Sequence, residues 1–296
     1  MSGGDSTAMR STDSGVTWTA SRSEAAMLHS SWNSVAYGNG MFVAVADSHA
    51  MYHTMRTTDD GVTWTSYGQA AYSGSSPTNP EDTEDFNGWS SITYGNGVFV
   101  AVALYGTNNT MISTNGITWT RRPSSNDANA WSSVAFSAVE GVFVAVASSG
   151  SSCTMRSTDD GVTWTGHPSS DDTNGWNSIA YGDGVFVAVA GGEKENSAMR
   201  STDGGVTWTG HRSSNDSHTW RSVAYGDGVF VAIADDGVGA TNRSMSSTDR
   251  GVTWTGHPTS DDDNAWMSVA FGNGLFLAVA IKYPPSYETM THPSVF

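Results

Sequence analysis

The sequence has 296 residues and a formal net charge of −16, and only two of its residues are lysines. Such an acidic surface repels nucleic acid and anionic membranes, so neither is an expected partner. The single cysteine, Cys153, cannot form an internal disulfide. The longest apolar run, residues 98–104, is too short to span a bilayer, and the first residues predict no secretory leader.

Two phrases alternate along the chain, and each occurs six times. The first is Ser-Thr-Asp-Asp-Gly-Val-Thr-Trp at 157–164, with copies at 11–18, 57–64, 113–119, 201–208 and 247–254. The second is Trp-Asn-Ser-Ile-Ala-Tyr-Gly-Asp-Gly-Val-Phe-Val-Ala-Val-Ala at 176–190, with copies that begin at Trp32, Trp89, Trp131, Trp220 and Trp266. A repeat of about 45 residues is typical of a propeller or another array, so we expect one domain over residues 1–296.

Each repeat predicts four short strands. In the copy at 176–190, Trp-Asn-Ser-Ile-Ala-Tyr alternates between two faces, Gly-Asp-Gly forms a hairpin, and Val-Phe-Val-Ala-Val-Ala is apolar enough to be covered on both faces. The third and fourth strands are expected at 155–158 and 162–165 in this type of repeat. Between them, Asp159 should accept hydrogen bonds from backbone N–H groups while Gly161 takes a left-handed backbone. We call this connection the aspartate turn.

The position of Asp159 is expected to be structural in every repeat. In the six copies this position is occupied by Asp13, Asp59, Asn115, Asp159, Asp203 and Asp249. The third copy has asparagine there and one residue fewer, so its turn is expected to differ from the others.

The chain begins and ends within a repeat. Residues 9–19 supply a third and fourth strand, residues 266–280 supply a first and second, and five whole blades are expected at 32–65, 89–120, 131–165, 176–209 and 220–255. We therefore predict an all-β fold, a six-bladed β-propeller of four-stranded antiparallel blades, in which the N-terminal strands complete the C-terminal blade and remove its exposed edge. The C-terminal tail, 281–296, contains a weak copy of the third strand at 289–291. A competing tail, or closure between chains, therefore remains an alternative.

The phrase Ser-x-Asp-x-Gly-x-Thr-Trp resembles the Asp-box (BNR) repeat of sialidases, sortilin-type receptors and photosystem assembly factors. The resemblance covers nearly the whole chain and implies a β-propeller whose Asp boxes lie away from the active centre. It also implies that a sialidase would need three converging arginines, a tyrosine–glutamate pair and an acidic proton donor. The early Arg-Ile-Pro motif of such enzymes is absent, and Arg10, Arg56, Arg156 and Arg200 recur at one strand position, as scaffold residues do. We expect no catalytic residues and no enzyme activity.

Candidate ligand-binding residues lie in the loops opposite the aspartate turns. The longest link, 66–88, carries two tyrosines, and an Asp-x-Asn-x-Trp motif precedes four of the first strands. The candidates are Tyr67, Tyr72, Asp85, Asn87, Asp127, Asn129, Asp172, Asn174, Asp262 and Asn264. The Asp-x-Asn pairs fit two interpretations, either caps of the turn that enters the innermost strand or polar pockets for a glycan or a cation.

No cofactor or metal site is expected. His167, His211 and His257 recur at one position in three different blades, so they should lie too far apart to share a metal ion. Cys153 has no recognisable nucleophile context.

These features predict a non-catalytic binding or assembly module. We expect it to be a structural or adhesion component of a larger particle, such as a virion or phage appendage, with a protein or a surface glycan as partner. A virion or cell-surface location is favoured over the cytoplasm. The first alternative is a soluble polyvalent glycan-binding lectin, and the second is a divergent sialidase-like glycosidase.

Overall fold

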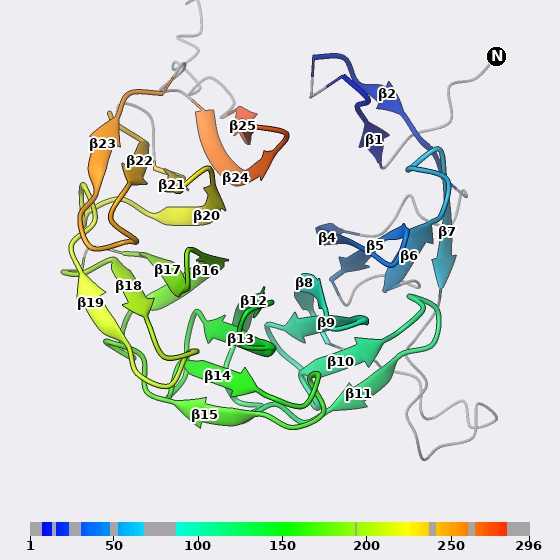
Figure 1. Cartoon of the computed structure of the whole chain (residues 1–296), viewed down its shortest axis with the longest axis horizontal. Coiled ribbons are helices and arrows are strands. Elements are labelled where there is room, and N and C mark those ends of the chain that lie inside the picture. Colours follow the sequence, from blue (N-terminus) through cyan, green and yellow to red (C-terminus); the bar gives the residue numbers. More distant parts are fainter. Residues whose placement is uncertain are drawn as a thin grey trace, which may run out of the picture.

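The structure, a computed structural model, describes residues 8–13, 16–23, 31–47, 53–67, 87–192, 194–236, 241–259 and 264–282. These residues form 25 strands. No helix in these ranges is long and apolar enough to cross a membrane. The strands follow one another around a ring, with the first strand of each repeat nearest the centre and the fourth at the rim (Figure 1). The all-β class expected from the repeats is confirmed.

Four repeats fold into antiparallel four-stranded sheets with the strands in chain order. They are β8 (Trp89–Gly95), β9 (Val98–Ala103), β10 (Thr110–Ser113) and β11 (Thr120–Arg122); β12 (Trp131–Ser137), β13 (Val142–Ala147), β14 (Thr154–Ser157) and β15 (Thr165–His167); β16 (Gly175–Gly182), β17 (Val185–Gly191), β18 (Ala198–Ser201) and β19 (Thr209–His211); and β20 (Trp220–Gly226), β21 (Val229–Ala234), β22 (Ser244–Ser247) and β23 (Thr255–His257).

The first full repeat has one strand more than the sequence predicts. Its strands are β4 (Trp32–Gly38), β5 (Met41–Ala46), β6 (Thr54–Thr57) and β7 (Thr63–Tyr67). An additional strand, β3 (Arg22–Ser23), pairs parallel to β7 on the outer edge.

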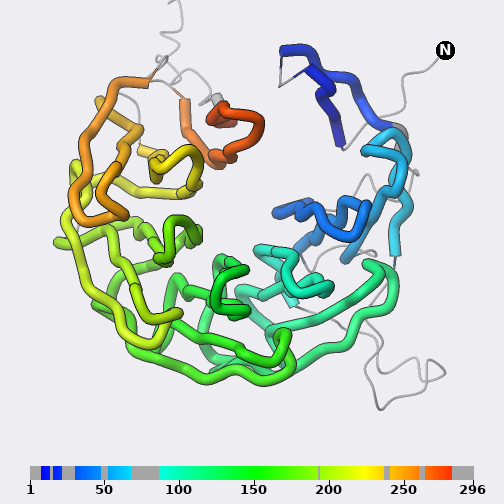
Figure 2. The backbone as a smooth tube through the Cα atoms, viewed as in Figure 1, coloured from blue at the N-terminus to red at the C-terminus, as the bar shows by residue number. Residues whose placement is uncertain are grey.

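The two ends of the chain form separate two-stranded sheets. β1 (Met9–Arg10) pairs with β2 (Thr19–Ala20), and β24 (Asn264–Gly272) pairs with β25 (Leu275–Lys282). Among the described residues no strand pairing joins β25 to β1, so the strands assigned to the predicted composite blade lie in two separate sheets. The chain trace in Figure 2 shows the ring open at this point, which we call the seam.

The fourth strand begins later than predicted, because the aspartate turn is longer than the sequence indicates. Asp159 Oδ1 accepts a hydrogen bond from the backbone N–H of Thr163 at 2.9 Å, and Oδ2 accepts one from its hydroxyl at 2.7 Å. β15 starts only at Thr165, two residues beyond Thr163. In the first full blade Thr63 makes the same two bonds to Asp59, but β7 already starts at Thr63, where it pairs with β3.

The strand boundaries also correct the position of Tyr67, which we expected in the link that follows the repeat. Tyr67 is the last residue of β7 and pairs with Thr54, just as His167 ends β15 and pairs with Thr154. The β-prone run Thr-Trp-Thr-Ser-Tyr continues the strand through Tyr67. Tyr67 therefore holds the repeat position of the three histidines.

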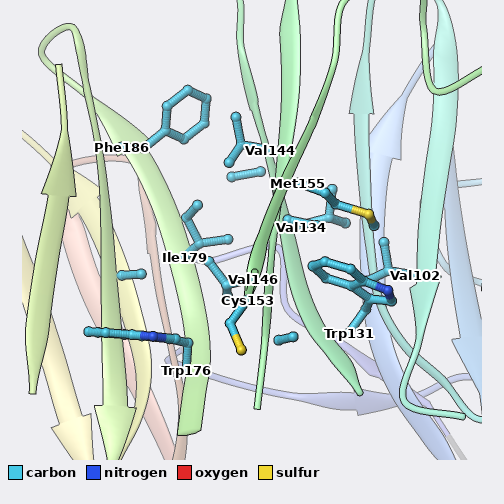
Figure 3. Packing of buried hydrophobic residues seen from close by; sticks show 14 of the residues in the cluster. Val102, Trp131, Val134, Val144, Val146, Cys153, Met155, Trp176, Ile179 and Phe186 are labelled. Carbon is cyan, nitrogen blue, oxygen red and sulfur yellow. The ribbon is translucent and has the colours of Figure 1, made fainter. Parts of the chain in front are cut away.

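The hydrophobic core lies between neighbouring blades. Met155 of β14 packs with Trp131 of its own blade and with Val102 of the preceding blade, and all three side chains are buried (Figure 3). The same trio of second-strand valine, first-strand tryptophan and third-strand methionine recurs as Val45, Trp89 and Met111; Val146, Trp176 and Met199; and Val189, Trp220 and Met245. Burial of each large side chain contributes roughly 1.5–3 kcal/mol, so these four interfaces between blades carry a similar apolar contribution.

Serine side chains tie the innermost strands together around the ring. In five of the six Trp-x-Ser phrases the serine hydroxyl accepts a hydrogen bond from a backbone N–H of the next blade, as in Ile179 N to Ser133 Oγ at 3.2 Å. The equivalent bonds run from Ile92 to Ser34, Val134 to Ser91, Val223 to Ser178 and Val269 to Ser222, at 3.1 to 3.2 Å. The preceding side chain often bonds to the next tryptophan carbonyl, as in Asn177 Nδ2 to Trp220 O at 2.9 Å. The register between blades is thus fixed by hydrogen bonds as well as by packing.

Candidate functional site on the loop face

The two faces of the ring carry different connections, as strand direction predicts. The glycine hairpins and aspartate turns share one face, where Asn96 Nδ2 donates a hydrogen bond to Asp160 Oδ1 at 3.1 Å and Arg250 Nε lies 3.8 Å from Asp183 Oδ2. The links between second and third strands and the links between blades leave the opposite ends of the strands. We call that side the loop face.

Each aspartate turn is held by hydrogen bonds to the aspartate carboxylate from residues of the same turn. The carboxylate of Asp249 accepts hydrogen bonds from the N–H and the hydroxyl of Thr253 at 2.9 and 2.6 Å and from the Ser247 hydroxyl at 2.8 Å. Burial raises its pKa, but these hydrogen bonds outweigh that effect and lower the pKa to about 2. In the shortened third copy, the single amide oxygen of Asn115 accepts hydrogen bonds from Ile117 N and Thr118 N, each at 2.9 Å. That turn differs, as expected, because one amide oxygen accepts the hydrogen bonds that two carboxylate oxygens share in the other copies.

On the loop face, the aspartate of each described Asp-x-Asn motif binds the backbone of the preceding blade. Asp127 accepts hydrogen bonds from the N–H groups of Asn108 at 2.9 Å and Asn109 at 3.2 Å, which lie between β9 and β10. Asp172 accepts hydrogen bonds from Ser152 at 2.8 Å and Cys153 at 2.9 Å. Burial raises the pKa of both carboxyl groups, but their hydrogen bonds outweigh this and lower it. Both aspartates are therefore ionised at neutral pH and cannot serve as proton donors.

The asparagine of the motif binds the blade that follows. Asn129 Oδ1 accepts a hydrogen bond from Ser151 N at 3.0 Å, and its Nδ2 donates to Ser151 O at 2.8 Å. Asn87 bonds to Thr107 in the same way, at 3.1 and 3.0 Å, and Asn174 Nδ2 donates to Asn196 O at 3.3 Å. All three asparagines are at most 2% exposed. In the two motifs that the structure describes completely, at 127–129 and 172–174, the aspartate and the asparagine together clamp the link to the loops on both sides of it.

The turn-cap interpretation accounts for all of these hydrogen bonds, whereas a role in ligand binding stays a prediction. Asn264 begins β24, and its carbonyl oxygen accepts a hydrogen bond from the buried Arg243 side chain. Tyr72, Asp85 and Asp262 lie outside the described residues.

The ends of the long link show a feature that the sequence analysis missed. Tyr105, between β9 and β10, packs against Gly88, where an added Cβ would lie 2.6 Å from the ring. Its hydroxyl donates a hydrogen bond to Asp47 Oδ1 in the preceding blade, yet 40% of the residue is exposed. Tyr67 stands at the other end of the link, with the Arg56 guanidinium 5.9 Å from its ring centre. The sequence does carry a signal for Tyr105. It is an aromatic residue in the link between a second and a third strand, and the equivalent link of the next blade is polar.

The other candidate groups are parts of the scaffold. Arg56 Nη1 donates to Asn115 O at 2.8 Å, and Arg156 Nε donates to Gly204 O at 3.0 Å, so each of these arginines binds the turn of the next blade. Cys153 is buried, and burial followed by the charge of Asp172 raises its pKa to about 11.

The histidines stand in three separate sheets, at the ends of β15, β19 and β23. Among the described residues no three His, Cys, Asp or Glu side chains gather as metal ligands would.

No protein-family model matches the sequence, and no curated protein is similar to it. Solved structures do match. YCF48 bound to D1 peptide superimposes with a TM-score of 0.63 at 18% identity, over 93% of this chain and 82% of that one. YCF48 from Cyanidioschyzon merolae gives 0.62 at 16% identity, over 93% and 85%.

The chain is a β-propeller. A GH74 enzyme from Niastella koreensis also matches, with a TM-score of 0.58 at 14% identity, over 81% of this chain but 42% of that one. At these identities the likeness establishes the fold, and the propeller spans less than half of the glycosidase. Which groups act on a ligand must be argued from this propeller's own residues.

Proposed function

We propose that this propeller is a non-catalytic binding and assembly module that recognises a protein partner on its loop face. The observation that carries the proposal is the clamp formed by the two fully described Asp-x-Asn motifs, at 127–129 and 172–174. Because Asp127 and Asn129 fix one link to the loops of two blades, the side chains between the clamps stand on a rigid backbone. A pre-organised surface of this kind loses little conformational entropy when a partner binds.

The proposed centre of recognition is the long link between the first two full blades. Tyr105 and Tyr67 flank it, and Asp47 adds a carboxylate beside Tyr105. Aromatic rings with a polar tip are favoured at protein interfaces because they bury apolar area and still satisfy hydrogen bonds. A solved propeller of similar fold binds a peptide, which favours a protein segment as the partner. We expect this protein to be a structural or adhesion component of a larger particle, such as a virion or phage appendage.

The absence of catalysis is part of the proposal. Its support is that Arg56 and Arg156 are occupied by backbone carbonyl groups and that the described loop aspartates are occupied by backbone N–H groups. These charged groups are already engaged by the scaffold, which favours a structural role over substrate binding or proton transfer.

We further propose a six-bladed ring whose last blade is completed by the N-terminal strands. The supporting observation is register: Met9 pairs with Ala20 and Arg10 with Thr19, as Met199 pairs with Gly210 and Arg200 with Thr209 in a complete blade. The N-terminal hairpin therefore already has the form of a third and fourth strand.

The function is tested by applying the isolated protein to an array of overlapping peptides and to a glycan array. Peptide binding that falls in Tyr105→Ala, and in the double variant Tyr67→Ala/Tyr72→Ala, would support the proposal. Asp159→Ala is the matched control, since its turn lies on the opposite face. Binding that is lost in folded Asp159→Ala but kept in both tyrosine variants would place the site on the wrong face.

A glycan-binding lectin is the second candidate, because an exposed tyrosine beside a carboxylate also suits a sugar ring. Binding to the glycan array alone would favour it. Turnover of a sialoside or another glycoside would overturn the non-catalytic assignment.

A further inference from the structure

A cavity of about 160 Å³ lies beside the seam, between β21 and the sheet of β24 and β25. Its lining includes Ile233 and Trp266. In the repeat these residues correspond to Val102 and Trp131, which pack around Met155 (Figure 3). The cavity therefore occupies the place that a third-strand methionine fills in a complete blade.

The methionine that the repeat assigns to this cavity is Met9. Residues 8–13 and 198–203 have the same sequence, Ala-Met-Arg-Ser-Thr-Asp, and Met9 corresponds to Met199. Met199 is fully buried, whereas Met9 is 61% exposed. An apolar side chain and an apolar cavity of matching position thus stand on opposite sides of the seam.

The free edge of β25 shows the same shortage of contacts. Leu277 and Val279 are 38% and 47% exposed, whereas their equivalents in the third full blade, Val144 and Val146, are fully buried. Those valines pair along the backbone with β14, and their side chains face the next blade: Val146 packs with Trp176 and Met199, and Val144 Cγ2 lies 2.7 Å from a Cβ added at Gly205. At the seam these two places belong to β1 and to the first full blade. A long apolar strand with an open edge is a strong site for strand pairing.

The N-terminal hairpin already occupies its place against the first full blade. A Cβ added at Gly161 would lie 2.9 Å from Ile112 Cγ2 and 3.1 Å from Val100 Cγ2, which come from the third and second strands of the preceding blade. At the equivalent Gly61, the same atom would lie 3.7 Å from the Cβ of Arg10, the equivalent of Ile112. The second neighbour that the repeat predicts for Gly61 is Leu277, the equivalent of Val100.

The innermost strands on both sides of the seam also carry unmatched groups. Val35 is 57% exposed, although its equivalents Ile92, Val134, Ile179, Val223 and Val269 are 5% to 7% exposed. Tyr37 is 58% exposed, and at Gly272 an added Cβ would meet nothing within 4 Å. In the neighbouring interface a Cβ at Gly226 would lie 2.1 Å from the ring of Phe271. Tyr37 and Gly272 are thus the two halves of one missing contact.

From these matches we propose that the seam is a built docking surface whose occupant is this chain's own N-terminal side, the described residues of β1 and β2 together with β4. Met9 enters the cavity beside Trp266, and Tyr37 covers Gly272. The backbone N–H of Val35 donates a hydrogen bond to the Ser268 hydroxyl, as Val269 does to Ser222. This inference rests on the six-bladed closure proposed above and deepens it by naming the socket and the inner contacts.

Docking fixes the register between β1 and β25. In complete blades the pairs are Phe186 with Ser201, Val187 with Arg200, Ala188 with Met199 and Val189 with Ala198. The corresponding seam pairs are Phe276 with Ser11, Leu277 with Arg10, Ala278 with Met9 and Val279 with Ala8. Directly opposed residues of an antiparallel pair lie about 4.5–5.5 Å apart at Cα, within the range of a disulfide.

Cysteine cross-linking tests this register in a Cys153→Ala background. The variant Arg10→Cys/Leu277→Cys is in register, and Arg10→Cys/Val279→Cys is two residues out of register on the same face. Val231→Cys/Ser246→Cys joins directly paired positions of an intact blade and serves as the positive control. We expect the in-register pair to oxidise to the same extent as the positive control, as a monomer on non-reducing gels, and the out-of-register pair to oxidise less.

Three results would overturn the proposal. One is a positive control that oxidises while the in-register pair does not. The second is an in-register pair that links only between two chains, because the occupant would then be a second copy. The third is preferential cross-linking in Leu277→Cys/Thr291→Cys, which would assign the edge to the C-terminal tail. Cross-linking involves no ligand, so its result does not depend on whether the loop face binds a partner. The binding assay on the loop face likewise stays valid if the cross-link does not form.

Discussion

The substitution Met9→Ala distinguishes an open ring from a closed one by its effect on stability. In an open ring Met9 is 61% exposed, and exposed substitutions usually change the free energy of unfolding by no more than about 0.5 kcal/mol. If Met9 fills the cavity between Ile233 and Trp266, its removal leaves a hole in a core interface. Methionine-to-alanine substitutions in cores cost about 2–5 kcal/mol, so the two states differ well beyond experimental error.

The matched control is Met199→Ala, because Met199 has the same flanking residues and is fully buried. Urea unfolding followed by tryptophan fluorescence measures both variants, and an unchanged slope against urea would show that the unfolded state is unaffected. We expect Met9→Ala to lose stability comparable to the loss in Met199→Ala. A full loss in Met199→Ala beside a loss of less than about 0.5 kcal/mol in Met9→Ala would refute the docking of Met9.

Three further predictions follow from the turns, the clamps and the ends of the chain. The pKa of Asp249 is about 2 in the folded protein against an ordinary 3.8, so its carboxylate stabilises the fold above pH 3.8 and loses this effect as the pH falls toward 2. The substitution Asp249→Asn should therefore make the melting temperature fall less steeply between pH 3.8 and pH 2. An equally steep fall in the variant would contradict this. Asp172→Ala should cost about 1–3 kcal/mol because it leaves backbone N–H groups of the adjacent loop unpaired, and it should speed modification of Cys153 by a thiol reagent, whereas Asp172→Asn should have a smaller effect. Deletion of residues 1–19 should cause aggregation that light scattering detects, while deletion of 281–296 should be milder; the reverse order would make the tail the clasp.

The strands and hairpins could be predicted from the sequence because their determinants are local. Gly-Asp-Gly and Asp-Asp-Gly supply left-handed backbone, and Asp183, Asp160 and Gly161 do have positive φ. The start of the fourth strand could not be predicted, since it differs with the neighbouring strand: β7 starts at Thr63 beside β3, whereas β15 starts at Thr165. The parallel strand β3 was missed for a similar reason, because Arg22–Ser23 has no strand pattern of its own and pairs only with the edge that β7 offers.

The contacts on the loop face could not be predicted from the sequence. The Asp-x-Asn motif was visible, but its partners lie about 20 residues away in a different link, and no local rule names them. Tyr105 was missed because its significance comes from Asp47 and Gly88, which the fold brings to it from elsewhere in the chain. The contacts that a side chain makes with another blade can be identified only from the three-dimensional arrangement of the blades.

The repeated side chains of this propeller bind other parts of the propeller, and this gives a rule for finding its partner site. The first-strand serines, the third-strand arginines and the Asp-x-Asn residues each form the same kind of contact from blade to blade, so their recurrence is explained by the ring itself. Residues that break the repeat have no such explanation. His218 stands where other blades have asparagine and faces Asp236, and Tyr105 reaches Asp47 where the next blade has only polar residues. Of these two departures, His218 is 5% exposed and can act only through its own blade, whereas Tyr105 is 40% exposed and can touch a partner directly. The search for a partner should therefore begin at Tyr105.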